Sequence, residues 1–474
     1  MLFNSLEFFI FLAVVLPLYY VLNRRAQNAM LLGASYFFYG YWDYRFLSLV
    51  AISTLIDFWA ARAIDREQRP RMRKLFLACS MTANLGLLGF FKYYNFFIDS
   101  AARTLETFGL QANMPVLYVI LPVGISFYTF QTMSYTIDVY RRHLPASDDL
   151  LDFALYVCYF PQLVAGPIER ATNLLPAIQS RRVVTSKMVA TGCVLILVGL
   201  FRKVVIADGI ASQIDPVFAS PGAHSTPALL KALYLFALQI YCDFAGYSDI
   251  ARGTSRLMGI ELMVNFNHPY FASNISDFWR RWHISLSTWL RDYLYIPLGG
   301  NRNGELKTYR NLMLTMLLGG LWHGAAWSFV VWGGLHGLYL VGYRLFGSLR
   351  KKVRVAGTGA GSFPFLGRLI GMFLTFHLVL LTWLFFRASG LGSAIVYLQQ
   401  ILSFRGMENW LSVLPLIAVP WLLVFLIDIP QHLSGDHTVM LSWPRLVRHG
   451  IYATLLFLVI LGFGTHAPFI YFQF

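Results

Sequence analysis

Long apolar runs that contain no Asp, Glu, Lys or Arg recur along the whole chain, and they constrain the fold more than any other feature. A transmembrane helix needs about 20 apolar residues, or about 17 at the short end. Ten runs meet or approach that length: 8–23, 26–42, 75–91, 107–137, 153–168, 311–343, 369–386, 388–404, 409–427 and 450–474. Backbone groups inside a bilayer must be hydrogen-bonded within their own segment, which favours helices. The runs therefore predict an all-α polytopic membrane protein.

Weaker stretches bring the expected number of spans to roughly ten to twelve. Residues 46–61 are interrupted only by Asp57, and the flanks of 188–201 and 232–242 could extend them to full length. Charged residues make up 13% of the 474 positions, against roughly 25% in soluble domains. The first run has no basic region before it and no small-residue cleavage site after it, so we expect a retained span and not a signal peptide.

The formal net charge of +15 comes from Lys and Arg gathered in short stretches between the apolar runs. Residues 62–74 hold six basic side chains against two acidic ones, and residues 350–354 hold four basic ones. Loops of this kind lie on the cytoplasmic side of a membrane, which would place the N-terminus outside. The same distribution explains the charge without a nucleic-acid partner.

Residues 243–310 depart from the pattern of spans. They are too rich in arginine to cross a membrane and too rich in aromatic residues for a solvated loop. Irregular backbone at membrane depth survives only where protein or a water-filled cavity covers it. We therefore expect a re-entrant or interfacial element on the cytoplasmic side, within one membrane domain that covers residues 1–474.

His323 is the best candidate for chemistry among the eleven histidines. It lies in the uncharged run 311–343, whose glycine pairs 319–320 and 333–334 and single Gly324 could divide the run into two half-helices. An ionisable group at membrane depth is costly, so it should face a cavity or a partner. A histidine titrates near pH 6.5 and therefore suits general-base catalysis at neutral pH.

Two other histidines need weighing against His323. His283 lies in the re-entrant segment and, taken alone, would suit an interfacial side chain between aromatic anchors. His336 lies thirteen residues after His323, so it would face away on an unbroken helix, and we expect a structural role for it.

The carboxylates are sparse where His323 lies. No Asp or Glu occurs between Glu305 and Glu408, so a carboxylate that orients His323 would have to come from elsewhere. The nearest candidates in sequence are Asp243, Asp249, Asp277 and Asp292. No HExxH pair, serine-hydrolase elbow or P-loop is present, so we expect no metal, and a serine hydrolase or P-loop pump is disfavoured.

A series of motifs, in order along the chain, makes it resemble the membrane-bound O-acyltransferases, and within them the bacterial alginate O-acetyltransferase branch. They are the stretches 122–127, 162–168 and 239–251, the segment 265–270, RRWHISLS with LWHG, and the ending 468–474. The resemblance implies about eleven transmembrane helices and re-entrant helices around a central tunnel. It implies His323 and His283 as the catalytic pair.

The resemblance also implies the substrates and partners. Acetyl-CoA would be the acyl donor, with no bound cofactor, and the acetyl group would cross the bacterial inner membrane to an exopolysaccharide such as alginate or cellulose. A periplasmic acetyltransferase of the SGNH type would complete the transfer. We expect Arg280 and Arg281 to bind the phosphates of the donor. The full set of residues expected to bind substrate around the histidines is Trp322, Arg280, Arg281, Trp282, Ser285, Asp243 and Asp249.

Three alternatives stay open from the sequence. Peptidoglycan O-acetylation and teichoic-acid D-alanylation belong to the same family and differ only in acceptor or acyl group. A proton-coupled transporter of a sugar or lipid intermediate could also use intramembrane histidines. No inverted repeat supports the transporter, and only an acyltransferase would release free coenzyme A from acetyl-CoA.

Overall fold

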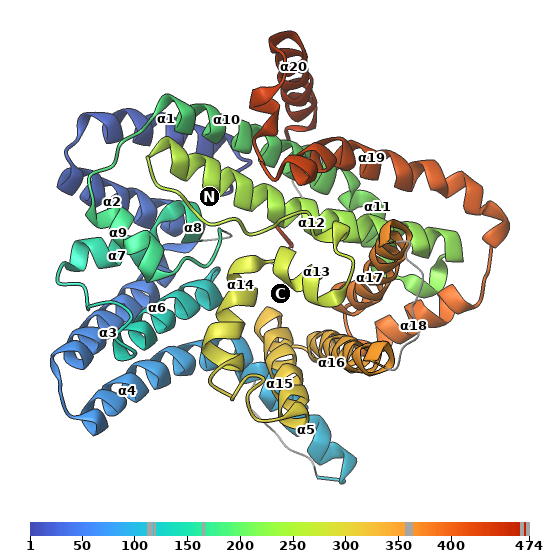
Figure 1. The fold of residues 1–474 in the computed structure, drawn as a ribbon, viewed down its shortest axis with the longest axis horizontal. Coiled ribbons are helices and arrows are strands. Elements are labelled where there is room, and N and C mark those ends of the chain that lie inside the picture. The colour runs from blue at the N-terminus through green and yellow to red at the C-terminus, as the bar shows by residue number, and fades with distance from the viewer. Residues whose placement is uncertain (111–116, 118–119, 164–165, 356–363, 465–468, 471–474) are drawn as a thin grey trace. The chain divides into compact units, whose positions relative to one another are not determined.

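The computed structural model describes all residues except 111–116, 118–119, 164–165, 356–363, 465–468 and 471–474, and the side chains of 348–355 are also left out. The chain is 80% helical, and the described part contains no strand (Figure 1). The predicted all-α class is confirmed. The chain divides into a first unit, residues 1–196 with 249–263, and a second unit, residues 197–248 with 264–474.

The helices of the first half of the chain are α1 (Leu6–Val21), α2 (Arg24–Asp43), α3 (Leu47–Arg66), α4 (Pro70–Leu88), α5 (Tyr94–Thr107), α6 (Ile125–Tyr140), α7 (Leu150–Cys158), α8 (Phe160–Leu163), α9 (Ala171–Gln179) and α10 (Ser186–Leu200). Helices α3, α4 and α6 pack side by side in the first unit (Figure 1).

The remaining helices are α11 (Gly209–Ala219), α12 (Thr226–Leu257), α13 (Ile275–Arg281), α14 (Ile284–Leu290), α15 (Glu305–His323), α16 (Trp327–Val355), α17 (Pro364–Arg387), α18 (Leu391–Leu402), α19 (Trp410–Ser434) and α20 (Arg445–Gly462). A π-helical turn, η3 (Phe201–Asp208), joins α10 to α11.

Seven helical stretches of the described chain are long and apolar enough to cross a membrane, and α1, α18 and the stretch Leu150–Leu163 are shorter apolar helices. The two weak candidates 188–201 and 232–242 lie within α10 and α12, whose flanks extend them as expected. Parts of the predicted runs 107–137, 153–168 and 450–474 lie outside the described residues. The chain is a multi-pass membrane protein.

Asp57, which interrupts an otherwise apolar stretch, lies fully buried in α3. Its carboxylate accepts hydrogen bonds from the Ser80 hydroxyl and the Asn84 amide of α4 and from the Thr136 hydroxyl of α6. A buried carboxylate is tolerated when donors satisfy its oxygens. Asp57 therefore joins three neighbouring helices of the first unit instead of ending one of them.

The boundary predicted at residue 243 is wrong, because it falls inside α12. That helix continues without a break to Leu257, and its most apolar window is 78% buried. The irregular segment begins only after Leu257 and contains the seven-residue helices α13 and α14. The arginines that suggested a loop, Arg252 and Arg256, are instead paired within the first unit, with Asp249 and Glu261 respectively.

The predicted division of the run 311–343 into two half-helices is confirmed at one of the three glycine sites. Helix α15 ends at His323 and α16 begins at Trp327, with Gly324 in extended backbone between them. The pairs 319–320 and 333–334 do not break either helix. A Cβ on Gly320 would lie 2.2 Å from the Phe329 carbonyl oxygen, and one on Gly333 would lie 2.2 Å from that of Met316. These glycines bring the backbones of α15 and α16 into direct contact.

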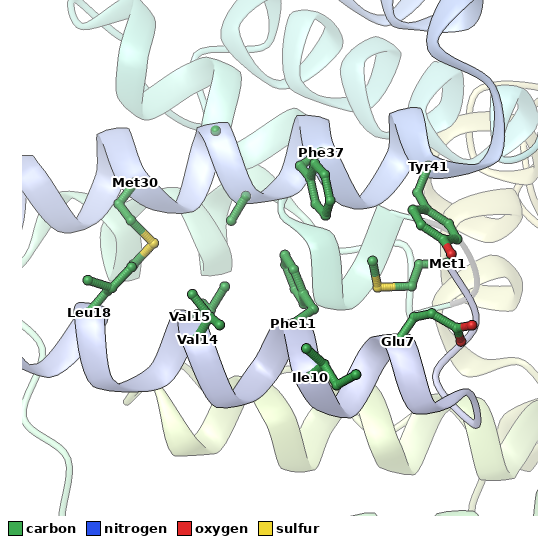
Figure 2. Close-up of a pocket in the computed structure, with 12 residues that line it drawn as sticks. Met1, Glu7, Ile10, Phe11, Val14, Val15, Leu18, Met30, Phe37 and Tyr41 are labelled. Carbon is green, nitrogen blue, oxygen red and sulfur yellow. The ribbon is translucent and has the colours of Figure 1, made fainter.

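An apolar groove of about 620 Å³ lies between α1 and α2 in the first unit (Figure 2). Apolar side chains such as Phe11, Leu18 and Phe37 line most of it, and Glu7 and Tyr41 lie together toward one end. None of its described lining residues is a histidine. The groove is typical of a surface that faces lipid.

Candidate active site

His323 occupies the last residue of α15, where the glycine break turns the chain into α16. The side chain is 4% exposed. Its ring lies 5.0 Å from that of Trp322, 4.9 Å from that of Trp332 on α16 and 5.5 Å from that of Phe386 on α17, measured between centroids. The imidazole is therefore enclosed by aromatic rings that exclude bulk water.

His283 lies between α13 and α14 and is fully buried. Its backbone has φ of 42°, in the left-handed region that a residue with a side chain rarely adopts. This conformation costs on the order of 1 kcal/mol and persists only where the surroundings enforce it. Strained residues of this kind cluster at functional sites, which supports a role for His283 beyond packing.

Asn265 fixes the orientation of the His283 ring. Its Oδ1 atom lies 3.2 Å from His283 Nδ1, 3.2 Å from the Ser285 backbone nitrogen and 2.9 Å from the Ser285 hydroxyl. A backbone N–H can only donate, so the Asn265 oxygen is the acceptor, and His283 Nδ1 carries the proton. In the neutral ring, Nε2 is then the basic nitrogen of His283.

The two predicted catalytic histidines lie close together in the second unit. Their ring centroids are 6.4 Å apart. Trp322 contacts both, because its ring lies 6.1 Å from that of His283 and 5.0 Å from that of His323. Two imidazoles at this separation can serve one reacting group, because a neutral ring can take a proton and the protonated ring that results can return it.

Three of the predicted substrate-binding residues lie around this pair. Trp322 touches both imidazoles, and Ser285 shares the Asn265 acceptor with His283. Trp282 is fully buried beside His283 in the sequence, and its ring packs against Phe266 and Trp383, at 5.0 and 4.8 Å. Trp282 therefore packs among the aromatic side chains next to His283.

Asp243, which we expected to meet the substrate, belongs to a buried ion cluster of the second unit. Its Oδ1 lies 2.8 Å from the Lys203 ammonium, which is also 2.7 Å from Asp208. Its Oδ2 accepts a hydrogen bond from the Ile470 backbone N–H at 2.7 Å. The carboxylate thus holds the π-helical turn and the C-terminal segment to α12.

The other carboxylates that we considered as partners of His323 each form an ion pair with an arginine. Asp277 pairs with Arg281 and Asp292 with Arg291, at 3.0 and 2.7 Å. Asp249 belongs to the first unit, where it pairs with Arg252 at 3.0 Å. The orienting group in the site is instead the amide of Asn265, which acts on His283.

The two predicted phosphate-binding arginines differ in their surroundings. Arg280 is exposed at the end of α13. Arg281 is half-buried, and its guanidinium pairs with Asp277 and donates to the Asn267 carbonyl. Of the two, Arg280 has the side chain that is exposed and able to reach an anion.

The sequence interpretation missed Asn265 and Phe244. Asn265 stood in a motif, but it was assigned no role, although an amide among buried apolar residues signals a hydrogen-bonding task. The ring of Phe244 packs against that of His283 in an edge-to-face arrangement, with centroids 4.7 Å apart. Only the tertiary structure could reveal Phe244, since a phenylalanine in an apolar helix carries no such signal.

The prediction that His336 faces away from His323 rested on an unbroken helix and is wrong in that premise. The break at Gly324 puts the two histidines on different helices. Both rings pack against Trp332, whose centroid lies 4.9 Å from His323 and 4.7 Å from His336. His336 therefore lies next to the site.

Paired histidines enclosed by aromatic rings in a multi-pass helical membrane protein would suit acyl transfer, because the rings exclude the water that hydrolyses an acyl donor. The model of the membrane-bound O-acyltransferase family matches residues 128–387. The chain belongs to this family and is an O-acyltransferase.

Curated relatives show the same relationship over most of the chain. It is 39% identical to a probable alginate O-acetylase of Pseudomonas putida over the full length of both proteins. It is 43% identical to the corresponding protein of Pseudomonas aeruginosa, over 85% of this chain and 75% of that protein. It is 36% identical to a peptidoglycan O-acetyltransferase of Helicobacter pylori, over 86% of this chain and 81% of that protein.

Proposed function

We propose that the protein takes an acetyl group from acetyl-CoA on the cytoplasmic side and delivers it across the bacterial inner membrane for O-acetylation of an exopolysaccharide. The observation that carries the proposal is the pair of buried imidazoles with ring centroids 6.4 Å apart. The relatives named as alginate O-acetylases, one of them aligned over the entire chain, favour alginate or a similar polymer as the acceptor.

The residues suggest how the transfer proceeds. The acceptor hydroxyl oxygen attacks the thioester carbonyl carbon and gives its proton to His323, because an alcohol is a poor nucleophile until the proton leaves. The new C–O bond forms, the C–S bond breaks, and the leaving thiolate takes up a proton to give the free thiol. His283, held by Asn265, positions the reacting groups or relays that proton. The aromatic rings around His323 exclude water, which would otherwise hydrolyse the thioester.

The proposal places the donor and the acceptor on opposite faces of the membrane. The basic stretches at 62–74 and 350–354 favour a cytoplasmic side on which acetyl-CoA is available. Acetyl-CoA is highly charged and does not cross a bilayer unaided. A periplasmic acetyltransferase would then receive the acetyl group and pass it to the polymer.

Reconstitution into sealed, oriented liposomes tests the proposal. Acetyl-CoA is supplied on the cytoplasmic face, with the periplasmic partner and either alginate or peptidoglycan fragments on the other, and both free CoA and acetylated polymer are measured. We expect transfer only when donor and partner are on their respective faces. Equal transfer with both on the cytoplasmic face would refute the transmembrane route. Acetylation of peptidoglycan alone would replace the proposed acceptor.

The His323→Ala variant provides the catalytic test. Loss of a general base should lower the rate on the order of 10²–10⁴-fold, while membrane insertion stays normal. His283→Ala should lower the rate less, because His283 assists the transfer. Acetylation near the wild-type level by the His323→Ala protein would contradict the assignment.

A further inference from the structure

His336 has a hydrogen-bonding pattern that a packing role does not explain. The residue is fully buried on α16, and its Nε2 lies 3.0 Å from the hydroxyl of Thr382 on α17. That hydroxyl donates its single hydrogen to the Val379 carbonyl at 2.7 Å. Thr382 must therefore accept from His336, which places the imidazole proton on Nε2.

This tautomer leaves His336 Nδ1 as an acceptor. No residue that the structure describes donates a hydrogen bond to it. The rings of Trp279 and Trp332 contact the imidazole at 4.9 and 4.7 Å between centroids. The indole N–H groups of both tryptophans, and that of Trp383, are likewise buried without an acceptor among the described residues.

The cluster presents a buried acceptor and buried donors that a ligand with both kinds of hydrogen-bonding group can pair with. An unpaired buried polar atom destabilises the fold, so such atoms in folded proteins are almost always satisfied. One chemical group satisfies both kinds at once if it carries a donor and an acceptor side by side. A secondary amide does so, with its N–H for Nδ1 and its carbonyl for an indole N–H.

We propose that His336 and Trp332 bind a secondary amide in the thioester arm of the acyl donor and so position the thioester carbonyl at His323. This inference rests on the proposed use of an acetyl thioester. His336 is then a donor-binding residue that contacts the thioester arm away from the reacting carbon.

The spacing of the cluster fits this assignment. Trp332 contacts both imidazoles, so the centroids of His323 and His336 can be no farther apart than the sum of 4.9 and 4.7 Å. In a cysteamine thioester the reacting carbon and the amide nitrogen are separated by a sulfur and two carbons, roughly 5 Å when extended. With contact distances at both ends, one thioester arm spans the two histidines.

Two substitutions test the roles of the two ring nitrogens of His336 separately. His336→Gln keeps a donor near the Nε2 position for Thr382 and removes the Nδ1 acceptor. His336→Asn places an amide oxygen near the Nδ1 position and loses the bond to Thr382. Thr382→Val is the matched control, because it removes the same bond from the other side and keeps an imidazole whose Nδ1 can still accept from the amide N–H when the proton is on Nε2.

Each protein is assayed for kcat/KM with two acetyl donors, S-acetyl-N-acetylcysteamine, which has the amide, and S-propyl thioacetate, which lacks it. We expect the wild type to prefer the amide donor at least about tenfold, as one hydrogen bond provides. In His336→Gln the preference should fall to within about twofold. The Asn and Val variants should retain most of it. An unchanged preference in His336→Gln would overturn the inference.

A binding measurement keeps the inference separate from turnover. Pantetheine, which has the amides but no acyl group, should raise the melting temperature of the wild type and of Thr382→Val. It should bind His336→Gln at least about tenfold more weakly. Absence of turnover with either donor, together with this binding difference, would reject the proposed function and retain the amide site. Equal binding by wild type and His336→Gln would reject the amide site.

Discussion

Replacement of Asn265 by leucine should separate the orientation of His283 from its presence. Asn265 Oδ1 accepts three hydrogen bonds, one from the imidazole and two from Ser285, at 2.9–3.2 Å. Leucine has the same branched arrangement of side-chain heavy atoms, with a larger volume and no acceptor. His283 then loses the bond that fixes its proton on Nδ1, and Nε2 is no longer held as the basic nitrogen.

The expected magnitudes follow from these contacts. Removing a group that orients a functional histidine typically costs about 10–100-fold in activity. Two buried Ser285 donors are also left unpaired, at about 1–3 kcal/mol each, less whatever relaxation recovers. We therefore expect Asn265→Leu to lose about 10–100-fold in kcat, with little change in KM for acetyl-CoA, and to melt at a lower temperature.

Asn265→Asp is the matched control, because a carboxylate still accepts from His283 and Ser285. It should recover most of the kcat that leucine loses. The assay is CoA release by purified protein in liposomes, normalised to the folded fraction from a melting curve. A folded leucine variant with kcat within twofold of the wild type would refute the claim that Asn265 orients His283. Equal loss in both variants would show that the acceptor at position 265 is not what sustains kcat.

Three further predictions concern other parts of the molecule. Arg280→Ala should raise KM for acetyl-CoA about threefold to tenfold, as loss of one exposed charge contact does, whereas an unchanged KM would make Arg280 a lipid anchor. Gly333→Ala should lower stability by about 1–3 kcal/mol, because its Cβ would meet the Met316 backbone at 2.2 Å; Gly334→Ala, with its nearest contact at 3.5 Å, is the control, and equal melting temperatures would contradict the packing. Burial raises the pKa of the Glu169 carboxyl from 4.5 to about 7, so the folded state binds this proton more tightly than the unfolded state and loses stability as pH rises from about 4.5 to about 7. Glu169→Gln should show a smaller fall in melting temperature over that window, and parallel curves for the two proteins would refute it.

The apolar runs predicted the helical class because a span is a property of composition alone. The same reasoning failed at residue 243, where charged side chains seemed to end a span. Arg252 and Arg256 are compatible with a helix because Asp249 and Glu261 pair with them. Both pairs are local, because their members lie three and five positions apart. A hydropathy pattern counts each charge separately and does not show that two charges pair, so the boundary was placed too early.

The glycines of the run 311–343 show a similar limit. Sequence predicted a break but could not choose among three sites, since glycine serves both to interrupt a helix and to let two helices touch. Gly324 does the first, and Gly320 and Gly333 do the second. The assignment of His323 and His283 as catalytic residues stays a prediction, although the structure does bring the two rings close together.

The site also contains groups whose importance arises only from folding. Asn265 and His283 are separated by 18 positions in the chain and meet because the irregular segment folds back on itself. His336 was expected to face away from His323 on one helix, but the helix ends at His323 and the two residues lie on different helices. The periodicity of the sequence does not predict such contacts, because they depend on where a helix ends and on the direction that the next helix takes.

The glycine contact between α15 and α16 bears on how such an enzyme could diversify. Backbone atoms touch at Gly320 and Gly333, so the hairpin that carries His323 has no room to slide inward. A family member that transfers a bulkier acyl group must therefore keep the histidine in place and gain space from smaller side chains around it. Phe386 lies against His323 from α17, with ring centroids 5.5 Å apart, and a smaller side chain there would open space without changing the contacts at Gly320 and Gly333. Family members that differ in substrate size should therefore differ in the aromatic side chains around His323, while the α15–α16 hairpin stays the same.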